Sequence, residues 1–400
     1  MNNETRKETQ VLPKDVRYVG ADDLTLPLFE NQYPVRPMGV SYNSYLILDE
    51  KIAVMDSVDA RAADEWLAKL AHELDGRRPD YLVISHMEPD HSGSVLRLTE
   101  QYPAMRLVGN AKTFAMLRQF FGADAPSNDR LLEVGEGETL PLGAHTLHFM
   151  LAPMVHWPEV MVAYEETEKL LFSADAFGRF GALSRTAAAP WAPQARRYYY
   201  NIVGKYGAQV QALLKKASAL EIKTVCPLHG PVLTGEALGE ALRLYDLWSR
   251  WQSESPDDIL LAHASIHGNT ARAAELLKQK LEAKGARVTL CDLTTTEVSY
   301  AVANAFYCGK LVLACSTYDG GLFPPMEEFL SHLQAKGFRD RSVGLMENGS
   351  WAPAAARLMR AKLEEMKDLR VCGTVVSLRS ALSPASEAQM EALTTELCAE

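Results

Sequence analysis

The stretch YLVISHMEPDH, residues 81–91, carries the strongest structural signal in the chain. Its first half reads as a short apolar strand, and its second half places four polar side chains within six residues of the strand end. A loop can turn such closely spaced side chains toward two adjacent metal ions, whereas a solvated polar loop has no need of two histidines and two acids. The stretch therefore predicts a metal site whose first ligands are His86, Glu88, Asp90 and His91.

Three more side chains of ligand type follow other apolar strands farther along the chain. They are His156 after LHFML, Asp175 after KLLFS and His229 after TVCPL. Any one of them alone would more often be a hydrogen-bonded structural residue, and the six other histidines are read in that way. The constellation of seven carries the inference, because metal sites are built from several convergent side chains.

The first part of the chain reads as an α/β domain with many hairpin-like strand pairs. Apolar strands such as SYLIL (44–48) and VMVAY (160–164) alternate with helical stretches such as AADEWLAKLAHEL (62–74). A closing helix is predicted over 236–251, and QSESPDD (252–258) has the Pro, Ser and acidic residues of a linker. We therefore place the first domain at 1–253 and the second at 254–400.

The second domain shows a regular alternation of strands and helices. Five strands are predicted, and helices are expected from about Thr270, Pro325, Ala352 and Pro384. The strands are ILLAHA (259–264), RVTLCD (287–292), KLVLAC (310–315), RSVGLME (341–347) and RVCGTVVSL (370–378). This alternation predicts a parallel sheet covered by helices on both faces, and five strands in this length match a flavodoxin-like doubly wound unit.

Polar loops follow three strands of this second sheet, where ligands of doubly wound folds bind. The first leads into a helix, so its amides and hydroxyls can surround a phosphate without a lysine. No dinucleotide or Gly-Lys-Ser/Thr fingerprint is present, which favours FMN. The predicted cofactor residues are Ser265, Ile266, His267, Gly268, Asn269, Thr270, Ser316, Thr317, Tyr318, Asp319, Gly320, Asn348, Gly349, Ser350 and Trp351.

Composition narrows the class of protein. A formal net charge of −10 has the wrong sign for a nucleic-acid or anionic-membrane binder, and no apolar run is long enough for a membrane span. The polar N-terminus lacks the apolar core of a signal peptide, so a cytoplasmic location is expected. The six cysteines form no C-x-x-C pair, and Cys226 is read as a buried core thiol.

The order His86-x-Glu88-x-Asp90-His91, then His156, Asp175 and His229, resembles the metallo-β-lactamase fold and specifically its flavodiiron branch. The resemblance spans nearly the whole chain and implies an αβ/βα sandwich followed by the flavodoxin-like domain. Hydrolases of that fold usually carry histidine where this chain has Glu88. Four histidines and three carboxylates form a hard, anionic site that favours iron, and the three carboxylates with one bridging hydroxide neutralise two ferrous ions.

The resemblance also implies roles for the individual ligands. One iron takes His86, Glu88 and His156, the other takes Asp90, His91 and His229, and Asp175 bridges both, with a hydroxide or oxo group between the metals. Many relatives have a pocket histidine in an early Phe-His-Gly stretch, whereas this chain reads Phe29-Glu30-Asn31-Gln32. The pocket is therefore partly different, and Tyr198, Tyr199 and Tyr200 are candidates for a pocket phenol that stay outside the predicted site.

The implied function is an oxidoreductase in which FMN passes electrons to the diiron centre, which reduces dioxygen to water or nitric oxide to nitrous oxide. The preference between the two gases stays open. The resemblance further implies an external electron donor such as rubredoxin and a head-to-tail homodimer, with a dimer of dimers also open. The competing hypotheses are a dinuclear zinc hydrolase and a pure electron carrier; Glu88 argues against the first and the full ligand set against the second.

Overall fold

The structure, a computed structural model, describes residues 12–399, which fold as two compact units. The first contains residues up to 199 and 208–246, and the second contains 200–207 and the residues from 247 onward. The short segment 200–207 thus belongs to the second unit although its neighbours in sequence belong to the first. A domain boundary at Glu254 stays a prediction.

Two six-stranded sheets form the centre of the first unit. In the order in which they pair, the strands of one sheet are β1 (Val16–Tyr18), β6 (Tyr45–Ile47), β7 (Ala53–Met55), β8 (Tyr81–Val83), β9 (Arg106–Gly109) and β10 (Leu131–Glu133). Those of the other are β11 (Thr139–Pro141), β12 (Thr146–Leu151), β13 (Met161–Glu165), β14 (Leu170–Phe172), β15 (Thr224–Cys226) and β16 (Leu233–Thr234). Two small pairs lie between β1 and β6 in the chain, β2 (Ala21–Asp23) with β5 (Val40–Tyr42) and β3 (Leu28–Phe29) with β4 (Tyr33–Pro34).

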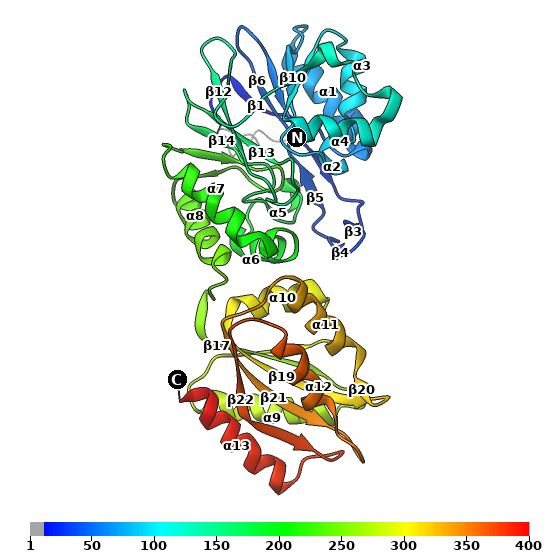
Figure 1. The fold of residues 1–400 in the computed structure, drawn as a ribbon, viewed down its shortest axis with the longest axis vertical. Coiled ribbons are helices and arrows are strands. Elements are labelled where there is room, and N and C mark those ends of the chain that lie inside the picture. The colour runs from blue at the N-terminus through cyan, green and yellow to red at the C-terminus, as the bar shows by residue number, and fades with distance from the viewer. Residues whose placement is uncertain (1–11, 400) are drawn as a thin grey trace. The chain divides into compact units, whose positions relative to one another are not determined.

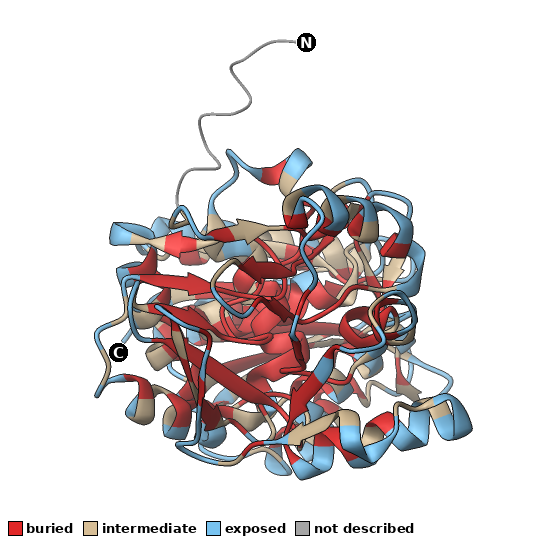
Figure 2. Ribbon diagram, turned by 90° about the horizontal axis from the view of Figure 1, so that it is seen from above, coloured by how far each residue is buried: buried red, intermediate tan, exposed pale blue. Residues whose placement is uncertain are grey.

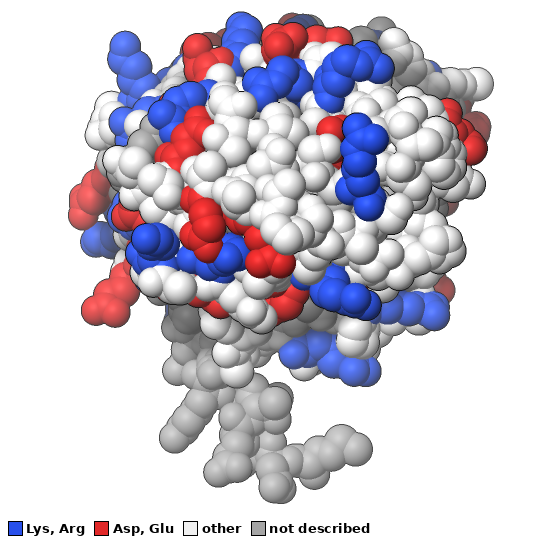
Figure 3. All heavy atoms as spheres, turned by 90° about the horizontal axis from the view of Figure 1, so that it is seen from below, with Lys and Arg blue, Asp and Glu red and all other residues white. Residues whose placement is uncertain are grey.

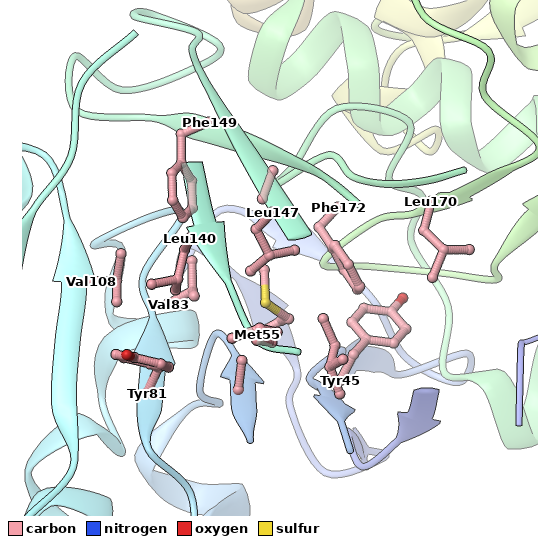
Figure 4. Close-up of a cluster of buried hydrophobic side chains, with 14 of the residues drawn as sticks. Tyr45, Met55, Tyr81, Val83, Val108, Leu140, Leu147, Phe149, Leu170 and Phe172 are labelled. Carbon is pink, nitrogen blue, oxygen red and sulfur yellow. The ribbon is translucent and has the colours of Figure 1, made fainter. Parts of the chain in front are cut away.

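The two sheets share one hydrophobic core. Tyr45 and Met55 from the first sheet pack with Leu147, Phe149 and Phe172 from the second, as Figure 4 shows. Strands such as β8 are buried along their whole length, which explains why YLV reads as a continuous apolar run rather than as an alternating one. Cys226 lies in this same core, which confirms the prediction of a core thiol.

Helices cover the sheets on their outer sides. Figure 1 shows α1, α3 and α4 beside the first sheet and α7 and α8 beside the second. Helix α1 buries Ala63, Trp66, Leu70 and Leu74, one residue per turn, as expected for an amphipathic helix. The helices of the unit are α1 (Ala63–Leu74), α2 (Pro89–Ser92), α3 (Val95–Gln101), α4 (Ala111–Phe121), α5 (Leu183–Thr186), α6 (Trp191–Tyr198), α7 (Gly207–Ala217) and α8 (Gly235–Ser249). This sandwich confirms the predicted fold, with the closing helix α8 ending two residues early.

The second unit is a parallel five-stranded sheet in the order β18-β17-β19-β21-β22, with the short β20 paired antiparallel to β19. Its strands are β17 (Ser255–Ala264), β18 (Val288–Asp292), β19 (Cys308–Tyr318), β20 (Gly321–Leu322), β21 (Arg341–Asn348) and β22 (Leu369–Leu378). Its helices are α9 (Asn269–Ala283), α10 (Val298–Tyr307), α11 (Pro324–Ala335), α12 (Ala355–Glu364) and α13 (Pro384–Cys398). The predicted doubly wound sheet is therefore confirmed.

Two details of the second unit differ from the sequence prediction. Strand β17 begins at Ser255, inside the segment predicted as a linker, because Ser255 already pairs with Cys308. Helix α10 was not predicted; its sequence VSYAVANAFY is apolar on nearly every side, so it shows no clear helical stripe. Helices α9 and α13 pack together on one side of the sheet, while α10, α11 and α12 form the other layer.

The interior is apolar and the surface carries both signs of charge. Figure 2 shows buried strands inside a periphery of helices with exposed outer faces. On the face drawn in Figure 3, lysine and arginine are interspersed with acidic side chains around a broad uncharged area, and no continuous basic patch is visible among the described residues there. Between residues 12 and 399, no helix is both long and apolar enough to cross a membrane.

Candidate metal centre and flavin pocket

The loops at the strand ends of the first unit bring the seven predicted metal ligands together. His86 and Glu88 follow β8, and the four-residue helix α2 presents Asp90 and His91. The other three ligands, His156, Asp175 and His229, follow β12, β14 and β15. Their side chains form two groups, and within each group the ligand atoms lie within 4.8 Å of one another. One group is His86, Glu88, His156 and Asp175; the other is Asp90, His91 and His229.

The first group converges on one point. His86 Nε2 lies 3.2 Å from Glu88 Oε2 and 3.3 Å from Asp175 Oδ2. His156 Nε2 lies 3.2 Å from Glu88 Oε2 and 3.1 Å from Asp175 Oδ2. Two imidazole nitrogens and two carboxylate oxygens at such distances surround a space that suits one cation.

The second group has the same form, and Asp175 reaches it with its other oxygen. His91 Nε2 and His229 Nε2 are 3.0 Å apart, and Asp90 Oδ2 lies 3.3 and 3.2 Å from them. Asp175 Oδ1 lies 3.4 Å from His91 Nε2 and 3.6 Å from His229 Nε2. The two carboxylate oxygens of Asp175 therefore face different groups, which is the geometry of a bridging ligand.

Hydrogen bonds on the far side of two imidazoles fix their tautomers. His86 Nδ1 donates to Glu159 Oε1 at 2.8 Å, and His229 Nδ1 donates to the carbonyl of Ser41 at 2.7 Å. A neutral imidazole that donates through Nδ1 keeps a lone pair on Nε2. Both lone pairs then point into the metal site, as metal coordination requires.

Several buried polar atoms of the site have no hydrogen-bond partner among the described residues: both carboxylate oxygens of Asp90, Oδ1 of Asp175 and Nδ1 of His91. Burying such atoms unsatisfied is costly, so carboxylate oxygens left in this state fit a site built for cations. The donor set of four histidines and three carboxylates thus fits the two metals that the sequence predicts.

The pKa values of the metal-free site also indicate that it attracts positive charge. Burial disfavours the charged form of His86, yet Asp175, Glu159 and Glu88 raise its pKa well above the usual value. For His156, burial is likewise outweighed by Asp175 and Glu88, which raise its pKa to about 9. Burial raises the pKa of Asp175, but His86 and the other histidines outweigh it and hold that pKa well below its ordinary range. The carboxylates attract positive charge, which protons supply when metal is absent.

A cavity of about 370 Å³ opens beside this site and is lined in part by the ligands Glu88 and Asp90. Glu30, at the tip of the β3–β4 hairpin, lines it as well; desolvation and then the neighbouring Glu88 raise the Glu30 pKa to about 7. Arg61 and Tyr42 line the same cavity, joined by a hydrogen bond of 3.0 Å between the guanidinium and the phenol oxygen. The carboxyl group of Glu30 therefore stands beside the ligand Glu88.

Sequence reasoning missed Glu159 and left Tyr198 outside the site. Glu159 is 1% exposed, and its Oε1 accepts from both His86 and the backbone nitrogen of Met87. Tyr198 is buried with its ring 5.5 Å from that of His229, and its hydroxyl has no hydrogen-bond partner among the described residues. Burial and then Asp175 raise the Tyr198 pKa, so the phenol keeps its proton.

A second cavity, of about 530 Å³, lies at the strand ends of the second unit. All the predicted cofactor residues line it except Gly268, whose φ of +87° starts α9 without a side-chain cap. Ala352 and Ser380 also line it and were not predicted. Trp351, which lines this cavity, is 88% exposed, and Tyr318 and Ile266 in the same lining are also exposed.

This second cavity suits a flat ligand that carries a phosphate. The uncapped first turn of α9 leaves backbone N–H groups for an anion, and hydroxyl and amide side chains stand around it. Its volume falls within the roughly 300–1,000 Å³ of small-molecule sites, and its aromatic side chains can stack on a ring system.

Comparisons with known proteins identify relatives that share the fold of both units. Residues 40–230 match the model of the family described as "ODP family beta lactamase". The chain is 28% identical to the rubredoxin-oxygen oxidoreductase of Megalodesulfovibrio gigas and 27% identical to the nitric oxide reductase of Moorella thermoacetica, covering 87% and 88% of each pair of chains. The crystal structure of the flavodiiron protein from Giardia intestinalis has the same fold, with a TM-score of 0.88, 24% identity and coverage of 98% of this chain and 97% of that one. With two groups of metal-ligand type that share Asp175 and a second unit of flavodoxin-like topology, this chain is similar in sequence and fold to the flavodiiron proteins.

Proposed function

We propose that this protein is an oxidoreductase that passes electrons from FMN to a non-haem diiron centre, which reduces dioxygen to water, nitric oxide to nitrous oxide, or both. The placement of Asp175 carries the proposal, because its two oxygens face two separate sets of nitrogen and oxygen ligands. The names of the two relatives, a rubredoxin-oxygen oxidoreductase and a nitric oxide reductase, support gas reduction.

The ligand roles follow from the two groups. His86, Glu88 and His156 would hold one iron, Asp90, His91 and His229 would hold the other, and Asp175 would offer one oxygen to each. When bound, FMN and the iron pair supply the electron transfer and the reduction of the gas. The protein's part is to fix the metals: Glu159 and the carbonyl of Ser41 orient two of the imidazoles.

The residues around the metal pocket control protons and access. Tyr198 holds a proton on its phenol oxygen inside the buried wall of the site and can donate it as a hydrogen bond to a bound ligand. Glu30 offers a carboxyl group beside Glu88 in the same cavity.

In the second unit, the loop Ser265–Thr270 and the start of α9 would hold the phosphate of FMN, and the two later loops would flank the ring. Tyr318 and Trp351 are the aromatic side chains available for stacking on the isoalloxazine. Every predicted cofactor residue except Gly268 lines the cavity, and Gly268 provides the backbone turn that starts α9.

We further propose a cytoplasmic protein that takes electrons from a separate carrier such as rubredoxin and works as a head-to-tail homodimer. The exposed Trp351 at the edge of the flavin cavity supports an assembled state, because a large apolar side chain at a pocket edge is usually covered in use. A partner subunit there would place the FMN of one chain against the metal centre of the other.

Elemental analysis and flavin extraction test the proposal. Two irons and one FMN per chain, with consumption of dioxygen or nitric oxide by the reduced protein under anaerobic handling, are the expected results. Two zincs per chain with esterase activity would identify a hydrolase instead. FMN without any metal after metal-replete expression would identify an electron carrier, and either result overturns the proposal.

A further inference from the structure

A hydrogen-bonded network of three buried side chains joins three loops of the flavin cavity and reaches the backbone of a fourth. Thr270 lies in the first turn of α9, Ser316 near the end of β19 and Asn348 at the end of β21, and they are 1%, 7% and 8% exposed. Asn348 Nδ2 donates to Thr270 Oγ1 at 3.2 Å, and Thr270 Oγ1 lies 2.8 Å from Ser316 Oγ. Ser380, after β22, is the fourth member.

The side-chain amide of Asn348 pairs with the backbone of Ser380 on both sides. Its Nδ2 donates to the Ser380 carbonyl at 3.1 Å, and its Oδ1 accepts from the Ser380 backbone nitrogen at 3.1 Å. Since an asparagine amide has two N–H bonds, the bonds to Thr270 and Ser380 use both of them. Asn348 therefore has no N–H left for a ligand, although it lines the cavity.

The network leaves one hydroxyl hydrogen without an acceptor. Thr270 and Ser316 have one hydroxyl hydrogen each, and the bond between them uses one of the two. Thr270 Oγ1 also accepts from Asn348, which uses no hydroxyl hydrogen. Whichever of the two hydroxyls donates to the other, the second hydroxyl keeps a hydrogen that has no acceptor among residues 12–399. Both hydroxyls line the cavity beside the uncapped start of α9, so this hydrogen is available to an anionic ligand.

We propose that Asn348 is a positioning residue for the phosphate of FMN: it fixes the Thr270–Ser316 pair so that its spare hydroxyl hydrogen meets the phosphate, and it ties the Ser380 loop to the cavity. The inference rests on the proposed FMN function. It changes the predicted role of Asn348 from direct contact to action through Thr270, and it adds Ser380 as the fourth loop of the site.

The test compares FMN with riboflavin, which lacks the phosphate, in fluorescence titrations of the flavin-free full-length protein. Asn348→Ala and Thr270→Val should each weaken FMN binding by about 10- to 100-fold, the usual loss for one hydrogen bond to a charged group, and change riboflavin binding by less than about 3-fold. Because Asn348 acts through Thr270, the double variant should bind FMN no more weakly than Thr270→Val alone.

Ser350→Ala is the matched control, because Ser350 lines the same cavity and bonds the hydroxyl of Ser380 at 2.8 Å but has no bond to Thr270. Its effect on FMN binding should add to that of Thr270→Val. If Asn348→Ala does not fold, as judged by circular dichroism, Asn348→Asp replaces it: this variant keeps the acceptor for Ser380, loses both donors, and should show the same coupling to Thr270.

Three results would overturn the inference: additive effects of the changes at Asn348 and Thr270, equal losses for FMN and riboflavin, or unchanged FMN binding in the Asn348 variant. These failures differ from failure of the proposed function, in which the wild-type protein itself would not prefer FMN to riboflavin.

Discussion

Glu159 Oε1 lies 2.8 Å from Nδ1 of His86 and 2.8 Å from the backbone nitrogen of Met87, so one buried carboxylate holds both a ligand ring and the loop that carries it. Removing such a partner typically lowers metal affinity about 10- to 100-fold. We expect Glu159→Gln to lose metal affinity near the lower end of this range, because an amide oxygen still accepts a hydrogen bond. Glu159→Ala should lose affinity near the upper end. Competition with a chelator measures the affinity.

Glu165→Gln is the control for this prediction. Glu165 is also fully buried and pairs with a histidine, His145 Nδ1, at 3.0 Å, but that pair lies outside both ligand groups. Its replacement should leave metal content unchanged even if it lowers stability. Equal metal affinity in wild-type and Glu159→Ala protein would show that His86 needs no such support.

Asp175→Asn should be the most damaging change to a single ligand. It removes a negative charge that both groups share and leaves an amide nitrogen or oxygen toward one of them, so affinity should fall by about 10- to 100-fold or more. FMN content should stay at one per chain, because the flavin cavity lies in the other unit. Metal analysis and flavin absorbance measure the two together.

Asp56→Asn supplies the comparison. Asp56 is 2% exposed and accepts from the backbone nitrogen of Ser85 at 2.7 Å, a bond that asparagine can keep. Burial raises its pKa to about 6, and Asp56 belongs to neither ligand group. Two metals per chain are expected in this variant. A normal metal content and gas reduction in Asp175→Asn would disprove the bridge.

The stabilisation given by metal should depend on pH through His156. In the metal-free protein its pKa is raised from 6.5 to about 9, although burial alone would lower it. A raised pKa contributes stability that is complete below about 6.5 and disappears as the pH rises through about 9. Metal replaces the proton, so the rise in Tm on adding iron should grow between pH 6.5 and 9. Anaerobic calorimetry with and without ferrous iron tests this; a rise that shrinks over the interval contradicts it.

The sequence predicted those parts of the site that depend on strand ends. His86, His156 and His229 could be grouped because each follows an apolar strand, and strand ends of one sandwich meet at one edge. Glu159 could not be found in this way, because its bond to His86 joins residues 73 apart and depends on how two loops pack. Its position three residues after His156 in the loop before β13 was the available signal.

The secondary-structure elements likewise divide into those that the sequence predicted and those that it missed. The helices with a clear polar and apolar side, or with a proline start, were predicted close to their true bounds, as α13 from Pro384 shows. Helix α10 was missed, since five of its buried residues are apolar and surround the helix rather than forming a stripe. The short strands β1 to β5 were missed because two or three residues carry no measurable periodicity.

The electron donor should be a separate protein. If electrons arrive through rubredoxin, as proposed, purified protein should oxidise NADH slowly until a reductase and rubredoxin are added. Stopped-flow absorbance of the flavin follows its reduction by prereduced rubredoxin. Rapid NADH oxidation by the protein alone, at the rate of gas reduction, would contradict the prediction.

The dimer prediction can be tested by mixing two inactive variants. Asp175→Asn lacks a working metal centre, and a variant altered at both Thr270 and Trp351 lacks FMN. If FMN of one chain serves the metal centre of the other, a mixed dimer has one interface with both groups intact and one with neither. Each mixed dimer should then show about half the activity of a wild-type dimer.

Different affinity tags allow mixed dimers to be isolated, and sedimentation confirms their mass. If electrons instead pass within one chain, each subunit of the mixed dimer lacks one of the two groups and activity stays at the level of the separate variants. Isolated mixed dimers without activity, or a fully active monomer in sedimentation, would therefore exclude the shared arrangement.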